Sequence, residues 1–311
     1  MTDKVVFMFP GQGSQVSGMR QNLGPADPGI DALFERAEEL LAIPLRGIID
    51  EGPIEELTRT SVAQPALLVT GFAAAQALSS RGYQADIVLG HSLGEYTALA
   101  WAGVIGFDDA VRLVRNRGLL MEQANERAPG GMAAVIGVAL DQLEPVVREI
   151  ADAHGVLEIT NINGPSNVVI SGENDALDAA IKTLRERRLG RAIHLSVSAP
   201  FHCSLMAPVA QEFSQLLAAV TFAPPTCTFI DNVTGKEERD PENIRAKLID
   251  QLTSPVLWTD AVDTAWSVGG RIFIECGPKA VLQGLVKRII REAELRSSEK
   301  LLGIAALEAD A

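Results

Sequence analysis

The pattern with the clearest chemical potential is Gly90-His91-Ser92-Leu93-Gly94, which reads Gly-x-Ser-x-Gly. An apolar run over 87–89 predicts a short strand before it, and residues 95–102 have a helical pattern after it. Small residues on both sides of Ser92 allow the sharp turn that presents a hydroxyl at a strand end. The Leu93 N–H at the helix start is then placed to bind an oxyanion. The pattern predicts a serine nucleophile, and a glycine-rich turn with an ordinary serine is the alternative.

A serine nucleophile needs a base, and the chain contains four histidines. His91 adjoins Ser92, and a side chain next to the nucleophile on such a turn points elsewhere. His154 lies at a predicted helix end, which indicates a capping or surface residue, and His194 lies inside a predicted strand, where we expect it to be packed. His202 lies in a loop, where catalytic groups are frequent, so its position makes it the best candidate for the base.

A second loop follows the apolar run over 5–9 and carries Gln12 between two glycines. Glycines allow the backbone to approach a ligand closely, so the loop is a candidate for a second oxyanion N–H. An ordinary turn is the alternative. The loop does not have the Gly-x-Gly-x-x-Gly pattern of nucleotide-binding loops, because its last position is Val16.

Three arginines, Arg112, Arg115 and Arg117, lie on one predicted helix over 110–125. Positions 112 and 115 share a face, whereas Arg117 is rotated away from them. An arginine that points into a site binds a carboxylate through two charge-assisted hydrogen bonds. From the residues alone, a solvated charge is the favoured interpretation of each.

The elements that must position these residues follow an α/β pattern. Short apolar strands are predicted over 5–9, 87–89, 227–231 and 272–275, with helical segments between them, which indicates a parallel sheet. The pattern changes between residues 128 and 198 to strand, helix, two strands, helix and strand, the βαββαβ order of a ferredoxin-like unit. We therefore predict a catalytic core over 1–127 and 199–311, and an inserted small domain over 128–198.

Composition narrows the function further. The chain has 311 residues, is 47% hydrophobic and carries a formal net charge of −13, which argues against a nucleic-acid-binding protein. Its three cysteines are widely spaced and indicate neither a disulfide framework nor a zinc site. The first residues lack the pattern of a signal peptide, and the apolar stretch over 66–78 is too short to span a bilayer. We expect a cytoplasmic protein that binds no membrane.

The motifs together resemble those of the malonyl-CoA:acyl carrier protein transacylases and of the acyltransferase domains of polyketide synthases. The resemblance covers residues 4–291. The ordered motifs that carry it are Phe9-Pro10-Gly11-Gln12-Gly13-Ser14-Gln15, Gly90-His91-Ser92-Leu93-Gly94-Glu95, Arg115-Asn116-Arg117-Gly118 with Met121, Ser198-Ala199-Pro200-Phe201-His202, Asn232-Val233-Thr234-Gly235, and Gln251-Leu252 with Pro255-Val256 and Trp258. Each motif is moderately specific, and the ordered set is highly specific.

The resemblance implies an α/β-hydrolase-like, parallel-sheet core with a ferredoxin-like insert. It implies that Ser92 is the nucleophile and His202 the base. The family orients its histidine through a backbone carbonyl at the position of Gln251 rather than through an aspartate. No acidic residue of this chain stands out as a third partner, which agrees with that arrangement.

The resemblance also assigns the groups that bind substrate. Backbone N–H groups of Gln12 and Leu93 would form the oxyanion hole, and Arg117 would bind the free carboxylate of a malonyl group. Phe201 resembles the malonyl-selective form of its loop. The implied reaction is ping-pong transfer of malonyl from malonyl-CoA, through a malonyl-serine ester, to the phosphopantetheine thiol of acyl carrier protein in fatty acid biosynthesis. It requires no metal and no resident cofactor.

Carrier proteins are usually acidic, so we expect a basic docking patch on this acidic chain. The chain offers two clusters of basic residues, and a solvated helix face is the alternative for each. They are Lys182, Arg185, Arg187, Arg188 and Arg191, and Lys287, Arg288 and Arg291. A monomer is the default expectation.

Three other functions stay open. The first is a free-standing acyltransferase that serves a polyketide synthase, which the motifs do not separate from the fatty acid enzyme. The second is a serine esterase or thioesterase, which Gly-x-Ser-x-Gly alone suggests, although such enzymes usually add an acidic residue and have no need of Arg117. The third is a non-catalytic carrier-binding protein, which the joint presence of Ser92, His202, Gln12 and Arg117 disfavours.

Overall fold

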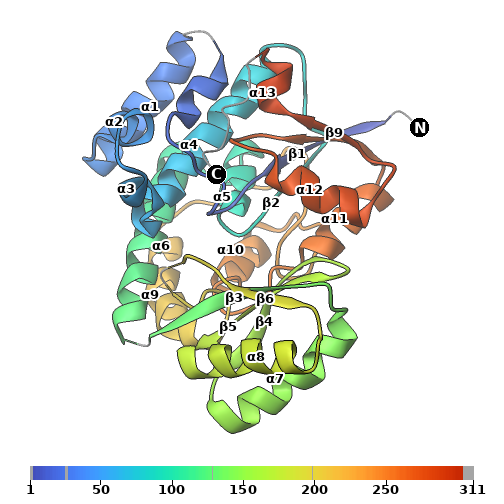
Figure 1. The fold of residues 1–311 in the computed structure, drawn as a ribbon. Helices are drawn as coiled ribbons and strands as arrows, with labels where there is room; N and C mark the ends of the chain where they lie inside the picture. The colour runs from blue at the N-terminus through green and yellow to red at the C-terminus, as the bar shows by residue number, and fades with distance from the viewer. Residues whose placement is uncertain (1–2, 25–26, 128, 198, 304–311) are drawn as a thin grey trace.

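The computed structural model describes residues 3–24, 27–127, 129–197 and 199–303. Its larger sheet has five parallel strands in the order β7-β2-β1-β8-β9 (Figure 1). The strands are β1 (Lys4–Phe9), β2 (Ile87–Gly90), β7 (Thr228–Phe229), β8 (Gly270–Glu275) and β9 (Glu294–Ser297). The neighbours β1 and β2 are buried on both faces, which explains why their sequences are continuously apolar rather than alternating. Phe9 pairs with Gly90, so the loops that carry Gln12 and Ser92 leave the sheet side by side.

Helices cover both faces of this sheet, and one of them forms the centre of the core. They are η1 (Met19–Leu23), α1 (Pro28–Leu41), α2 (Leu45–Asp50), α3 (Ile54–Thr58), α4 (Thr60–Ser79), α5 (Leu93–Trp101), α6 (Phe107–Arg127), η2 (Ser204–Met206), α9 (Ala207–Ala218), α10 (Pro241–Asp250), α11 (Trp258–Ser267), α12 (Val281–Ile289) and α13 (Ser298–Leu301). By length and composition, α4 could cross a membrane, but 89% of its most apolar window is buried inside the protein. It packs against α5 and α6 as a core helix.

The smaller sheet has four strands in the order β4-β5-β3-β6, and every neighbouring pair is antiparallel. Its elements are β3 (Gly130–Ile136), α7 (Leu140–His154), β4 (Leu157–Gly164), β5 (Asn167–Glu173), α8 (Asn174–Glu186) and β6 (Arg191–His194). This is the βαββαβ connectivity and strand order of a ferredoxin-like unit. The predicted fold class is therefore confirmed: a parallel α/β core that carries a small ferredoxin-like insert.

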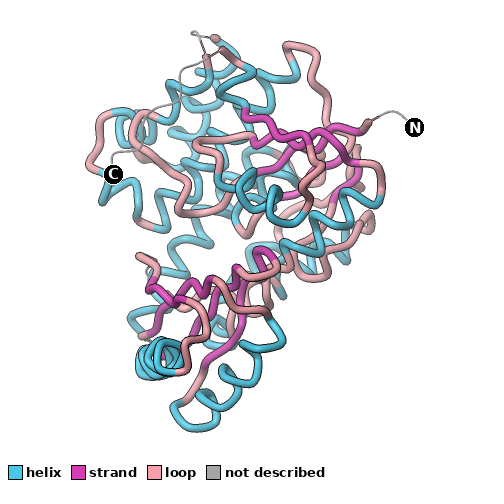
Figure 2. The backbone as a smooth tube through the Cα atoms, turned by 45° about the vertical axis from the view of Figure 1, so that its right-hand side comes forward, coloured by secondary structure: helices cyan, strands magenta, loops and turns pink. Residues whose placement is uncertain are grey.

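The insert presents one sheet face to its own helices and the other toward the core. Helices α7 and α8 lie on the far side of the small sheet, below it in Figure 1. Ala133 and Val135 pack with them, whereas the alternate residues Met132 and Ala134 line a pocket against the core. Figure 2 shows the insert standing below the larger sheet, joined to it by the segments on either side. The period-2 alternation of a strand thus separates structural from pocket-lining residues.

Several predicted boundaries differ from the structure. The strand predicted over 191–197 ends at His194, and the helix predicted over 206–220 is the turn η2 followed by α9. Strand β9 was not predicted because its sequence, Glu-Leu-Arg-Ser, lacks the apolar run of a buried strand and lies at the sheet edge. Residues 128 and 198, the predicted ends of the insert, lie outside the described residues, so the exact domain division stays a prediction.

Candidate active site

Ser92 lies on a strained turn between β2 and α5. Its backbone has φ 51° and ψ −104°, a region that residues with a side chain rarely adopt. Two glycines make this turn possible. A Cβ at Gly90 would lie 2.0 Å from the backbone of Gly94, and a Cβ at Gly94 would lie 1.9 Å from the carbonyl oxygen of Phe9. The Gly-x-Ser-x-Gly pattern is therefore a steric requirement for holding the Ser92 hydroxyl above the sheet.

Asn232 fixes this turn from the opposite side. Its Oδ1 accepts the backbone N–H of Ser92 at 2.7 Å, and its Nδ2 donates to the carbonyl of Gly90 at 2.6 Å. In the sequence, Asn232 has no indicated role beyond its place in the Asn232-Val233-Thr234-Gly235 motif. The structure shows that its buried amide replaces the hydrogen bonds that the strained turn cannot make within the backbone.

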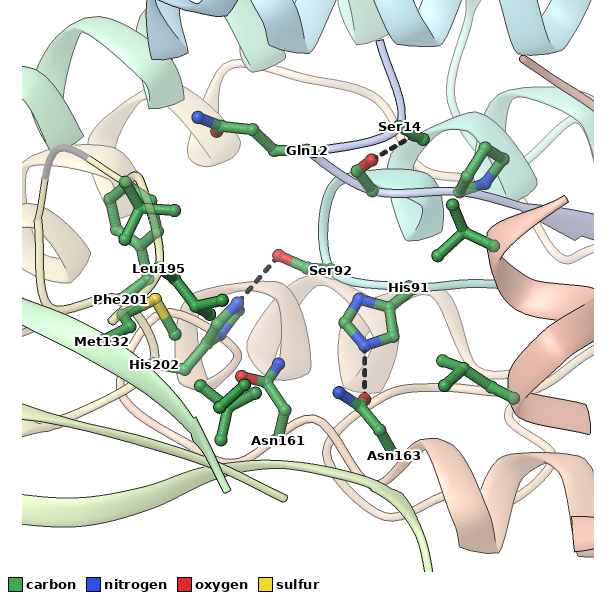
Figure 3. A pocket seen from close by; sticks show the side chains of 18 of the residues that line it. Gln12, Ser14, His91, Ser92, Met132, Asn161, Asn163, Leu195, Phe201 and His202 are labelled. Atoms are coloured by element: carbon green, nitrogen blue, oxygen red, sulfur yellow. Dashed lines mark hydrogen bonds between the residues drawn. The ribbon is translucent and has the colours of Figure 1, made fainter. Parts of the chain in front are cut away.

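His202 contacts the serine in the geometry of a general base (Figure 3). Its Nε2 lies 2.8 Å from the Ser92 Oγ, and its Nδ1 lies 2.7 Å from the backbone carbonyl oxygen of Gln251. A carbonyl only accepts, so Nδ1 carries the proton and Nε2 is free to take one from Ser92. Burial, with the positive charge of Arg117 nearby, lowers the pKa of His202 to about 3, which keeps the ring neutral near pH 7.

The other three histidines do not reach Ser92 Oγ. His91 points away and bonds Asn163 of the insert through Nε2 at 2.8 Å. His154 ends α7 on the surface, as expected. The expectation that His194 is packed is wrong: its side chain is 55% exposed and lies 2.9 Å from Asp178. The reason is that β6 is an edge strand, paired on one side only.

Of Arg112, Arg115 and Arg117, the structure brings Arg117 to the serine. It is 1% exposed, and its Nη2 lies 3.2 Å from the Ser92 Oγ. It also donates to amide oxygens, at 2.9 Å on Gln251 and 3.1 Å on Gln64, and its guanidinium lies 5.5 Å from the ring centroid of Tyr96. Burial lowers the pKa of Arg117, but a guanidinium stays charged near neutral pH. Arg112 is exposed and Arg115 donates to a backbone carbonyl at 2.6 Å, so neither enters the site.

The side chain of Gln251 has contacts that the sequence did not reveal. Its backbone carbonyl orients His202, as the resemblance implied. In addition its Nε2 donates to the carbonyl of Ser92 at 3.0 Å and to the carboxylate of Glu95, while its Oε1 accepts from Arg117. Gln64 was also missed, because it lies in an apolar helical segment without a motif and reaches Arg117 only through the fold.

A pocket of about 340 Å³ opens above Ser92 and His202 (Figure 3). The core supplies one wall, which includes Gln12 and the buried ring of Phe201. The insert supplies the other. Its lining residues are Met132, Ala134, Asn161, Asn163, Asn167, Val169, Leu195 and Val197. Leu93 is buried as the first residue of α5, where backbone N–H groups have no partner within the helix.

Among the described residues, no group of three or more His, Cys, Asp or Glu side chains could hold a metal ion. The pocket lining includes the hydroxyl of Ser92 and the neutral imidazole of His202, and the buried guanidinium of Arg117, outside the lining, donates to the Ser92 Oγ. Together they can open an acyl thioester by serine attack and hold an anionic acyl group beside the new ester.

Comparison with known proteins places this geometry in a family. The acyl transferase domain family matches residues 6–310. The malonyl CoA-acyl carrier protein transacylase of Bacillus subtilis is 40% identical over 288 residues, covering 93% of this chain and 91% of that protein. The enzyme of the same name from Escherichia coli K12 is 40% identical over 285 residues, covering 91% of this chain and 92% of that protein.

Solved structures give the same result. An acyl carrier protein S-malonyltransferase from Vibrio cholerae superimposes with a TM-score of 0.90 at 40% identity, covering 94% of this chain and 96% of that one. A structure described as a type II polyketide synthase acyl carrier protein in complex with its malonyl-transacylase has a TM-score of 0.89 at 37% identity, covering 94% of each chain. These matches extend along nearly the whole chain, and the strained serine and carbonyl-bonded histidine agree with them. The chain therefore belongs to the acyl transferase domain family and, within it, to the malonyl CoA-acyl carrier protein transacylases.

Proposed function

We propose that this chain transfers the malonyl group of malonyl-CoA to Ser92 and then to the phosphopantetheine thiol of an acyl carrier protein, in fatty acid biosynthesis. The observation that carries the proposal is the buried guanidinium of Arg117, 3.2 Å from the nucleophile. A cation at this distance from the attacking oxygen lies within reach of the far end of a three-carbon acyl group, where malonyl has a carboxylate and acetyl has none.

Arg117 makes no direct bond to an anion among the described residues. Its hydrogen-bond partners in the described part of the chain are neutral, its Nε has none there, and no described carboxylate forms an ion pair with it. The Glu95 carboxyl interacts with Arg117 electrostatically but forms no ion pair with it, and an anionic ligand in direct contact with the buried guanidinium is stabilised. Each hydrogen bond to a charged group contributes about 1.5–3 kcal/mol, enough for strong preference for malonyl.

The first half-reaction loads the serine. The Ser92 hydroxyl gives its proton to His202 Nε2 as Oγ attacks the thioester carbonyl, and the backbone N–H groups of Gln12 and Leu93 bind the resulting oxyanion. The carbon–sulfur bond then breaks, His202 returns the proton to the departing CoA thiolate, and the malonyl-serine ester remains. The Gln251 carbonyl holds the imidazole while it carries the extra proton.

The second half-reaction reverses these roles. The phosphopantetheine thiol gives its proton to His202, its sulfur attacks the ester carbonyl, and the Ser92 oxygen leaves and takes the proton back. Water must be kept from the ester between the two steps, and the mostly apolar insert wall does this. The expected cytoplasmic location and monomeric state stay predictions.

The carrier protein is proposed to dock beside α12. Lys287, Arg288 and Arg291 are exposed and, within the described part of the chain, form no ion pair. Arg288 lines a hollow with Ile136 and Asn167 of the insert, next to the main pocket. In the other cluster, Arg187 is already paired with Glu149 through two hydrogen bonds, and α8 lies on the far side of the insert. The acidic partner therefore fits the α12 cluster better.

A second candidate function is service to a polyketide synthase, which the similarity to the transacylase solved with a type II polyketide carrier protein favours. The chemistry at Ser92 is the same in both cases. Comparing kcat/KM for a fatty acid carrier protein with that for polyketide carrier proteins separates them, and a higher value for the polyketide carriers would contradict the assignment to fatty acid synthesis.

The test of the proposed reaction is intact-protein mass spectrometry. The protein is incubated with equal amounts of acetyl-, malonyl- and methylmalonyl-CoA without carrier protein, beside the Ser92→Ala variant. We expect a malonyl adduct on the unaltered protein and none on the variant. Consumption of the thioesters without an adduct would instead indicate a hydrolase. An intact thioester pool without an adduct would leave only a carrier-binding protein.

A further inference from the structure

Glu95 is a buried acid at the site to which the proposed reaction gives no role. It lies one turn into α5 from Ser92 and is 2% exposed. Within the described residues it forms no ion pair. Its Oε1 accepts the backbone N–H of Asn232 at 3.1 Å, and its Oε2 accepts from the Nε2 of Gln251. Burial and the neighbouring Asp231 carboxylate raise the pKa of Glu95 to about 8, while these two donors and the charge of Arg117 favour its charged form.

The direction of the Gln251 amide matters, because its two ends meet opposite partners. Its Nε2 faces two acceptors, Glu95 and the Ser92 carbonyl, and its Oε1 faces the donors of Arg117 at 2.9 Å. If the amide were reversed, its oxygen would face both acceptors and its NH₂ group would face a guanidinium. The Glu95 carboxyl is one of the two acceptors, and in its ionised form it makes the reversal most costly.

We propose that Glu95 is a positioning residue that fixes the Gln251 amide, and through it holds Arg117 in the orientation that accepts a carboxylate-bearing acyl group. The inference rests on the proposed function and adds a residue that determines its specificity. It also explains why a glutamate occupies a buried position here: a glutamine would have to turn an NH₂ group toward either the Gln251 amide or the Asn232 N–H.

The Glu95→Gln variant tests this at constant side-chain size. If the substituted side chain keeps its amide oxygen on the Asn232 N–H, its NH₂ group displaces the Gln251 amide and Arg117 loses its acceptor. Three quantities are measured on the full chain: the single-turnover rate of Ser92 loading by malonyl-CoA, the same rate for acetyl-CoA, and the labelling rate of Ser92 by a neutral fluorophosphonate. Thermal melting confirms that the variant is folded.

We expect malonyl loading to fall by about tenfold or more, while acetyl loading and fluorophosphonate labelling fall by less than about threefold. Equal losses in all three rates would show that Glu95 only supports the Ser92 turn, and would overturn the proposal. So would an unchanged malonyl rate. If the unaltered protein forms no malonyl ester at all, the proposed function itself fails, which is a different result from a variant that merely loses no selectivity.

A second variant separates positioning from folding. Gln251→Met removes the amide but keeps the backbone carbonyl that orients His202. If Glu95 acts through that amide, adding Glu95→Gln to Gln251→Met lowers malonyl loading by less than about twofold further, because the contact is already gone. Losses that multiply in the double variant would show that the two residues act independently and would contradict the proposal.

Discussion

The two walls of the pocket differ in the chemistry that they present. The core wall carries the strained Ser92 and the neutral imidazole of His202. The buried cation of Arg117 lies next to the serine, and hydrogen bonds of 3.2 and 2.8 Å join Arg117 and His202 to the Ser92 Oγ. The insert wall presents apolar side chains and three asparagines, and none of its lining residues is charged. Both walls come from one chain and face the same cavity.

This difference shows how the fold divides its tasks. In the core, Ser92 stands at the junction of β2 and α5, His202 in the loop before η2 and Arg117 in the middle of α6. The proposed mechanism assigns proton transfer and charge recognition to these groups. The insert sheet offers one face to its own helices and the other to the pocket, which suits a wall that excludes water and shapes the acyl site. If the division holds, core variants change the rate of loading and insert variants change what happens to the loaded ester.

The largest effect should come from His202. Because the proposed mechanism gives the proton of Ser92 to His202, we expect His202→Ala to lower the single-turnover rate of malonyl loading by roughly a thousandfold. His91→Ala is the matched control, since His91 bonds Asn163 of the insert rather than the serine. Its loading rate should fall by much less. If the loading rate fell as much for His91→Ala as for His202→Ala, the proposal that His202 alone among the histidines acts on Ser92 would be contradicted.

The second effect concerns charge. Arg117→Ala should lower malonyl loading by at least about 10- to 100-fold, because it removes the proposed partner of the substrate carboxylate, and should spare acetyl loading. The measurement is mass-spectrometric loading with each thioester. Arg115→Ala is the control, since Arg115 lies two residues away and donates to the Ser61 carbonyl instead. If the Arg117 variant lost loading by malonyl-CoA and by acetyl-CoA equally, the result would contradict a role for Arg117 in recognising the substrate carboxylate.

Much of the fold could be predicted from local patterns. The runs over 5–9 and 87–89 are apolar because both faces of β1 and β2 are buried, so the sequence signal is strong. The order of strands and helices after residue 128 predicted the insert sheet. Strand β9 and helix α13 could not be predicted, because they lie at the edge of the core and their sequences are largely polar.

The site was predictable where a residue sits in a local pattern. Ser92 follows from the spacing of its glycines, and the position of His202 in a loop favoured it among the histidines. Arg117 looked like a solvated charge until the resemblance was considered, because its partners Gln64 and Gln251 are 53 and 134 residues away in the sequence. No local pattern reveals such contacts, and Glu95 was missed for the same reason.

The two basic clusters, one in the core and one in the insert, should differ in their effect on carrier-protein binding. Reversing charge in the core, Lys287→Glu with Arg288→Glu, should raise the KM for acyl carrier protein severalfold and leave Ser92 loading by malonyl-CoA unchanged. The matched pair in the insert, Arg187→Glu with Arg188→Glu, should change KM less, because Arg187 is already paired with Glu149. Steady-state kinetics at low and high salt measure both. A larger rise in KM for the insert pair would show that the carrier protein docks at α8 instead.

The smallest effect should come from the insert wall itself. Met132→Ser places a hydroxyl in the apolar lining above the ester without touching Ser92 or His202. We expect loading to change by less than about twofold, while hydrolysis of the malonyl-serine ester without carrier protein rises severalfold, because water gains a hydrogen-bond partner in the pocket.

Ala133→Ser is its control, on the opposite face of the same strand. That hydroxyl enters the insert core against α7 and α8, so it should lower the melting temperature and leave ester hydrolysis unchanged. Mass spectrometry of the decaying ester measures the first effect and thermal melting the second. If both variants hydrolyse the ester equally fast, the insert protects it through its overall stability. If only Met132→Ser does, the protection lies in the one face of β3 that looks into the pocket, and the insert contributes to acyl transfer by controlling access to chemistry that the core performs.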